Sequence, residues 1–132
     1  MDLRWVVLEE SLRAEKKENA YQLMQNLLSQ NREIPQILLC SSDLIAIGVM
    51  AALREKGCRV PKDVGVIGFD DISFATLLSP ELTTISQPVK EMAEKAVELI
   101  VNNELTGMTD GKFVFPVTLV ARQTTMKRGD NL

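Results

Sequence analysis

Hydrophobic positions along this chain alternate between two spacings, and together they predict an α/β fold. Short apolar runs at residues 3–8, 36–40 and 64–69 predict three strands. Between these runs, apolar residues recur every three or four positions, which predicts helices over residues 20–28 and 44–56. Strands that alternate with helices form parallel sheets through right-handed crossovers. We therefore expect a three-layer α/β/α domain built on a parallel sheet.

The helix predicted over residues 44–56 is apolar on nearly every side until Arg54. A helix of this kind is buried on more than one face. One face suits the sheet, and the other suits a partner subunit, although a neighbouring helix of the same chain would also cover it. Further apolar residues follow the third predicted strand. The residues that we expect at an interface between two copies are Ile47, Met50, Phe74, Leu77 and Leu78.

The second half of the chain has a different pattern. Residues 82–88 and 113–120 read as extended segments, and residues 92–101 between them read as a long amphipathic helix. Pro116 has no N–H to donate to a sheet, so the second extended segment is expected to be an edge strand or a crossing between layers. The polar tail, residues 126–132, is expected to be frayed.

Composition restricts the function classes. The chain has 132 residues, of which 45% are hydrophobic and 25% charged, which suits one globular domain. Its net charge of -3 offers no uniformly basic surface for phosphates, so the chain by itself is not expected to bind nucleic acid. No apolar run approaches the roughly 20 residues that span a bilayer, and the first residues do not form a signal peptide. We expect a cytoplasmic protein without a membrane partner.

The reactive side chains are few. The chain has no histidine, which excludes Ser-His-Asp triads and histidine-based zinc sites. Cys40 and Cys58 would lie at opposite ends of the helix over residues 44–56, roughly 20 Å apart, too far for a disulfide. They are expected to be free thiols. We expect no catalytic site, no metal site and no cofactor.

Polar residues stand where two of the predicted strands end. Ser42 and Asp43 follow the second strand, and Asp70 and Asp71 follow the third. Carboxyl ends of parallel strands form the edge where α/β folds bind polar ligands. Asp43 is also well placed to cap the helix that follows. The sequence therefore predicts a polar ligand site at this edge, with Asp71 as a loop or cap residue.

Five motifs in order resemble the C-terminal half of the effector-binding core of the LacI/GalR family of bacterial transcription regulators. The resemblance runs from about Trp5 to Thr125, which is nearly the whole chain but less than half of a complete family member. The motifs are residues 42–48, 57–64, 66–71, 80–88 and 119–124.

The resemblance implies two α/β lobes with the effector held between them, like a periplasmic sugar-binding protein of type I. Residues 1–88 would then form the C-terminal lobe, residues 89–112 a helix that packs on the N-terminal lobe, and residues 113–125 the strand that returns. The helix-turn-helix and most of the N-terminal lobe have no counterpart here, so DNA would be contacted only through a domain that this chain lacks. Since an apolar helix face is costly in water, we expect that helix to fold back onto its own lobe or to pack against a second copy.

The resemblance also implies the site residues. Asp70 matches a position whose carboxylate accepts hydrogen bonds from the effector, and Ser42 stands where many relatives carry asparagine. Gln87 matches a polar position of the cleft, although the crossover between lobes explains that residue equally well. The implied function is sensing of a sugar-like effector and dimerisation, without enzymatic activity. A sugar-binding protein that serves a transporter is the alternative.

Overall fold

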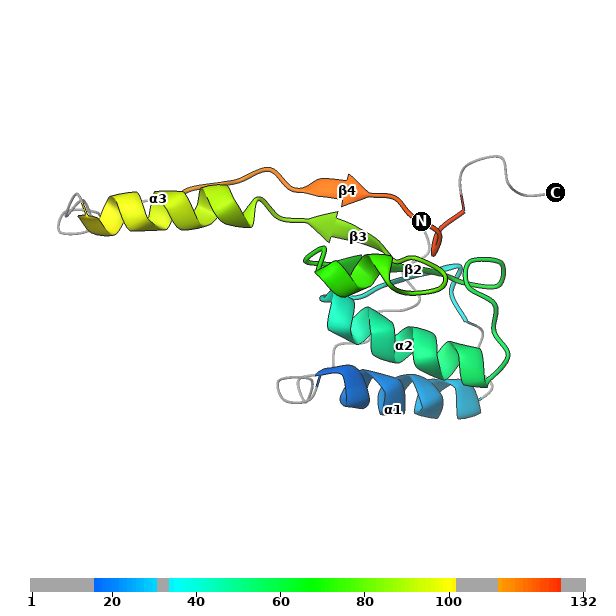
Figure 1. The fold of residues 1–132 in the computed structure, drawn as a ribbon. Coiled ribbons are helices and arrows are strands. Elements are labelled where there is room, and N and C mark those ends of the chain that lie inside the picture. Colours follow the sequence, from blue (N-terminus) through cyan, green and yellow to red (C-terminus); the bar gives the residue numbers. More distant parts are fainter. Residues whose placement is uncertain (1–15, 31–33, 102–111, 127–132) are drawn as a thin grey trace.

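The computed structural model describes residues 16–30, 34–101 and 112–126 (Figure 1). The strand predicted at residues 3–8 and the tail at residues 127–132 lie outside these residues. In chain order the elements are α1 (Lys16–Ser29), β1 (Ile37–Leu39), α2 (Asp43–Glu55), β2 (Gly65–Phe69), the short 3-10 helix η2 (Ser73–Thr76), β3 (Thr83–Ser86), α3 (Val89–Val101) and β4 (Thr118–Val120).

The strands form one sheet in the order β1-β2-β3-β4. β1, β2 and β3 are parallel, with Leu38 beside Val66 and Gly68 beside Thr84, while β4 is antiparallel to β3. The predicted parallel sheet is thus confirmed, and β4 adds the edge strand that the proline had indicated. Because the three parallel strands run the same way, their carboxyl ends lie at one edge of the sheet.

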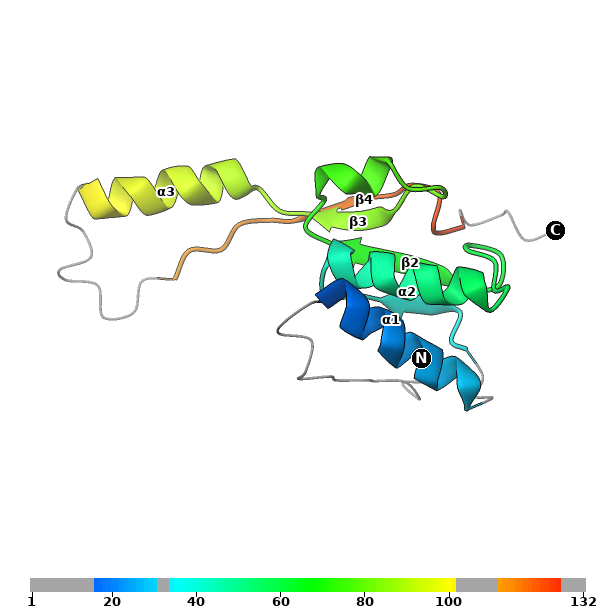
Figure 2. The same ribbon diagram turned by 60° about the horizontal axis from the view of Figure 1, so that its bottom comes forward.

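Helix α2 lies between α1 and the sheet (Figures 1 and 2). The two helices approach closely at Gly48, where an added Cβ would stand 2.2 Å from the carbonyl oxygen of Lys17. Ala46, Ala52 and Leu53 are fully buried beneath them. A neighbouring helix of the same chain, α1, therefore covers one face of α2, as in the alternative to a partner subunit. Ile47 remains half-buried.

The other face of the sheet is different. Ile37 and Leu39 point away from α2 and are exposed. Among the described residues, no helix packs against β1 on that side. The described part of the chain therefore shows two of the three expected layers.

Helix α3 projects away from the rest of the molecule (Figures 1 and 2). We call α3 and residues 112–117 the arm, and the remaining described residues the lobe. Within the described residues, α3 has no buried side chain, and its neighbour is the return segment, where the ammonium of Lys95 lies 5.1 Å from the ring centre of Phe113. The expectation that this helix folds back onto its own lobe is wrong, because the chain leaves β3 and continues straight outward. Packing against a second copy stays a prediction.

Both cysteines are free thiols. Burial, together with the nearby charge of Asp43, raises the pKa of the Cys40 thiol to about 12. Cys58 lies half-buried after α2. Within the described residues, no helix has the length and apolar character needed to cross a bilayer.

Candidate functional site

The edge formed by the carboxyl ends of the parallel strands carries the three predicted ligand residues. Ser42, Asp70 and Gln87 follow β1, β2 and β3, respectively. The structure joins two of them, because Nε2 of Gln87 donates a hydrogen bond of 2.9 Å to Oδ1 of Asp70. Asp70 is exposed, and a carboxylate has lone pairs left to accept further hydrogen bonds. This carboxylate is the acceptor of the candidate site.

The backbone under Asp70 has an unusual conformation. Asp70 has a φ of 116° and Asp71 a φ of 53°, and both values lie in the region that L-residues disfavour. The N–H of Asp70 donates to the carbonyl of Ile85 at 2.9 Å. The N–H of Asp71 donates to Oγ1 of Thr84 at 3.4 Å. Two residues of strand β3 therefore accept the backbone hydrogen bonds of this turn.

Ser42 lies close to the edge but already has a structural role. Its hydroxyl accepts a hydrogen bond of 3.3 Å from the N–H of Ile45 and so caps α2. The side chain is buried. The structure therefore does not join Ser42 to the pair formed by Asp70 and Gln87.

The prediction that Asp43 caps α2 is wrong. Asp43 is fully buried, and its carboxylate accepts hydrogen bonds from Oγ1 of Thr84 at 2.5 Å and from the N–H of Ile72 at 2.9 Å. Gly68 makes room for it, since a Cβ there would lie 2.1 Å from Oδ1 of Asp43. This buried carboxylate links the start of α2, strand β3 and the turn that follows Asp70.

Asp71 points toward a cation from a distant part of the chain. Nη2 of Arg122 lies 2.6 Å from Oδ1 of Asp71, and Nη1 of Arg122 donates to the carbonyl of Leu82 at 2.8 Å. This ion pair agrees with the prediction that Asp71 is a loop residue. The role of Arg122 was not predicted from the sequence. Its only signal was membership in the last motif, which does not indicate a partner 51 positions away.

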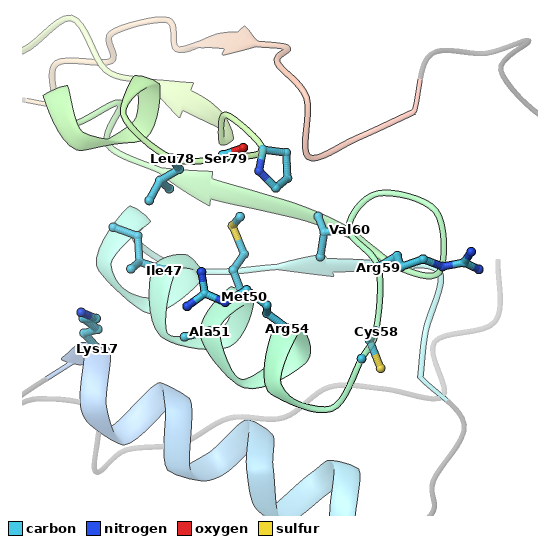
Figure 3. A pocket seen from close by; sticks show the side chains of 12 residues that line it. Lys17, Ile47, Met50, Ala51, Arg54, Cys58, Arg59, Val60, Leu78 and Ser79 are labelled. Atoms are coloured by element: carbon cyan, nitrogen blue, oxygen red, sulfur yellow. The ribbon is translucent and has the colours of Figure 1, made fainter.

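A second feature is a groove on the lobe beside α2. It encloses about 520 Å³ between α2, the 57–60 turn and the segment before β3 (Figure 3). Ile47 and Met50 extend from α2 toward Leu78. Phe74 and Leu77 are exposed in the segment that leads to Leu78. The structure therefore places three of the five predicted interface residues around one apolar groove.

Basic residues are also among those that line the groove, namely Lys17, Arg54 and Arg59. The guanidinium of Arg59 extends away from the groove and pairs with Asp63 (Figure 3). The predicted ligand edge and this groove are separate features, because the groove is not lined by Ser42, Asp70 or Gln87.

Comparison with known proteins identifies the family of this chain. A family model described as a periplasmic binding protein-like domain matches residues 1–125. The HTH-type transcriptional repressor PurR of Haemophilus influenzae (strain PittEE) is 42% identical over 83 residues, which are 63% of this chain and 24% of the relative.

Two solved structures show the same fold. A lac repressor dimer bound to operator and the anti-inducer ONPF matches with a TM-score of 0.74 at 30% identity, over 82% of this chain and 37% of that one. A LacI family transcriptional regulator from Arthrobacter sp. FB24 in complex with lactose matches with a TM-score of 0.72 at 35% identity, over 83% of this chain and 41% of that one. The chain thus spans about a quarter to two fifths of the length of these proteins.

Proposed function

Because this chain belongs to the periplasmic binding protein-like family and, within it, to the LacI/GalR regulators, we propose that it forms one wall of an effector site in a transcriptional regulator. The observation that carries the proposal is the exposed carboxylate of Asp70 at the carboxyl edge of the sheet, joined to Gln87. Ligands of open α/β sheets bind at this edge.

The chemistry of the edge favours an effector rich in hydroxyl groups. A carboxylate only accepts hydrogen bonds, and those it accepts are charge-assisted and strong. Gln87 occupies one oxygen of Asp70 and has a carbonyl oxygen of its own with which to accept a further bond. A sugar or related polyol offers several donors to such a pair. The lactose bound in the Arthrobacter regulator supports this class of ligand.

In the complete regulator, effector binding would close the cleft between two lobes and change the geometry of the DNA-binding heads. This is a two-state coupling between separate sites. The chain supplies the effector wall and does not contact DNA itself, as its net negative charge suggests. A regulator of this kind works in the cytoplasm, where its operator lies.

The groove beside α2 is proposed as the contact with a second copy. It presents Ile47, Met50 and Leu78, and the neighbouring Leu77 is 76% exposed. The lac repressor with the same fold was solved as a dimer, which supports this role. A transport protein with a similar core would work as a monomer, and the named relatives are repressors. An enzyme that uses Asp70 or Asp71 as a base or metal ligand is the weaker alternative, because the chain has no histidine, Gly-rich phosphate loop or nucleophile elbow. Arg122 also already pairs with the carboxylate of Asp71.

The effector proposal is tested by nuclear magnetic resonance with a panel of pentoses, hexoses, disaccharides and nucleobases. The best ligand should shift the amide signals of Asp70, Ile72 and Gln87. Asp70→Ala should weaken that ligand about 10- to 100-fold, because a hydrogen bond to a charged group contributes roughly 1.5–3 kcal/mol. Asp63→Asn, an aspartate change in a distant turn, is the control and should leave affinity unchanged. The proposal fails if no compound shifts these amides or if binding survives Asp70→Ala.

The dimer proposal is tested by sedimentation of two variants matched for exposure. Leu77 is 76% exposed beside the groove, and Val101 is 74% exposed on the arm. Leu77→Asp should weaken self-association at least tenfold, because it buries an unpaired charge in the contact. Val101→Asp tests the other expectation, that α3 packs against a second copy, and should leave association unchanged when the groove alone forms the contact. The opposite result would place the contact between copies on the arm instead.

A further inference from the structure

Arg122 lies just after β4, at the point where the chain returns from the arm to the lobe. Its N–H donates to Oγ1 of Thr83 at 2.9 Å, and its Nη1 donates to the carbonyl of Leu82 at 2.8 Å. The side chain is only 14% exposed. A planar guanidinium anchored in this way has a fixed direction. The orientation of its other terminal donor, Nη2, is therefore fixed as well.

Nη2 of Arg122 is directed at the turn that contains Asp70, the proposed acceptor for the effector. Nη2 of Arg122 lies 2.6 Å from Oδ1 of Asp71, whose side chain is 24% exposed. Asp70 and Asp71 both have positive φ values, 116° and 53°. Each such residue costs roughly 1–3 kcal/mol and persists only where its surroundings fix it. The conformation of this turn therefore depends on the contacts made by its neighbours.

Two contacts from distant parts of the chain hold the turn. From the core, the buried carboxylate of Asp43 accepts the N–H of Ile72 at 2.9 Å. From the edge strand, Arg122 holds the side chain of Asp71. Asp70 directly precedes Asp71 and lies two residues before Ile72, and its exposed carboxylate accepts the hydrogen bond from Gln87.

We propose that Arg122 is a positioning residue for the effector site. It does not touch the effector. By fixing Asp71, it holds the strained turn in the conformation that aims Asp70 at Gln87 and at the ligand. This inference rests on the proposed function for the meaning of Asp70, but the geometry that it predicts exists without any ligand.

The test uses the whole chain in the absence of ligand. Amide hydrogen exchange is measured in the wild type, Arg122→Met, Arg122→Lys and Asp71→Asn. The control is Asp63→Asn, which breaks the other Arg–Asp pair of the lobe, between Arg59 and Asp63. Asp70→Ala serves as the reference for the side-chain amide signal of Gln87 when its acceptor is lost.

In Arg122→Met and Asp71→Asn, exchange at Asp71 and Ile72 should become at least tenfold faster, while the amides of β2 keep their wild-type rates. The Gln87 side-chain signal should move toward its position in Asp70→Ala. Arg122→Lys should restore part of the wild-type signal, and Asp63→Asn should change neither measurement.

Two results would overturn the inference: unchanged exchange at Asp71 and Ile72, or equally faster exchange throughout β2, which would indicate general destabilisation. Should Arg122→Met fail to fold, Asp71→Asn carries the same test, because it removes the other partner of the ion pair. Because no ligand is used, failure of the sugar panel would count against the proposed function alone.

Discussion

Two helices of equal length show how differently the lobe and the arm are built. α2 and α3 each have 13 residues. More than half of the residues of α2 are buried, between α1 on one side and the sheet on the other. Within the described residues, α3 buries none. Helical pattern and length therefore do not set burial, which depends on what the rest of the fold brings to each face.

The arm consequently has apolar side chains that no other described residues bury. Val97, Ile100 and Val101 are all exposed along α3. Burying each such side chain contributes roughly 1.5–3 kcal/mol. The lobe has already gained this free energy in its own core, whereas the arm would gain it only from another surface. The resemblance assigns that role to an N-terminal lobe.

The largest predicted difference in stability between the regions comes from truncating one large aliphatic side chain in each, Leu53 in the lobe and Ile100 in the arm. Leu53 is fully buried in α2, and Ile100 is 65% exposed on α3. Leu53→Ala should lower the free energy of unfolding by about 2–5 kcal/mol, because it leaves a cavity. Ile100→Ala should change it by less than about 0.5 kcal/mol. Urea denaturation followed by circular dichroism measures both. Equal losses would mean that the arm is packed in solution and would break the comparison.

A smaller effect is expected from removing one negative charge in each region. Asp43→Asn replaces one of two buried acceptor oxygens with a donor, opposite either the Thr84 hydroxyl or the Ile72 N–H. It should cost about 1–3 kcal/mol. Glu94→Gln on the arm weakens a 3.8 Å contact with Lys90 and should cost about 0.2–0.5 kcal/mol. The same denaturation experiment compares them, and a larger loss for Glu94→Gln would contradict the assignment of the two regions.

The smallest effect concerns a charge pair at the surface of the lobe. Hydrogen bonds from the side chain and backbone of Arg59 lower the pKa of Asp63 to about 2. The folded pKa lies below the unfolded one, so the pair stabilises the lobe above about pH 4, and this contribution is lost as the pH falls toward 2. Asp63→Asn should remove this small part of the acid dependence. Titration of the Asp63 carboxyl carbon by NMR checks it. A midpoint near 4 would show that the pair does not form in solution.

Much of the lobe could be predicted from the sequence. The helix predicted over residues 44–56 and the strand over 64–69 agree with α2 and β2 to within a residue, because Gly57 and the turn after it punctuate the apolar pattern. The return strand was predicted over residues 113–120 but spans only Thr118–Val120. β3 already ends at Ser86, so the residues before β4 have no strand beside them.

Of the candidate site, the sequence predicts only those residues whose position follows from the end of a strand. Asp70 follows directly from the end of β2. Ser42 and Asp43 are adjacent and both suit an N-cap, so the sequence cannot tell which one caps α2 and which one turns into the core. The pairing of Arg122 with Asp71 joins residues far apart in sequence and needed the sheet order to be known.

The pairing of β3 with β4 has a topological consequence. Ser86 and Thr118 are direct partners in an antiparallel ladder. Ser86 is the last residue of β3, separated by two residues from the start of the arm, and Thr118 is the first residue after the arm. The arm is therefore an insertion at the tip of a β-hairpin. A short two-residue turn between these positions would close the same hairpin. A chain in which such a turn replaces the arm should therefore keep the pairing of β3 with β4 and the strand order of the lobe.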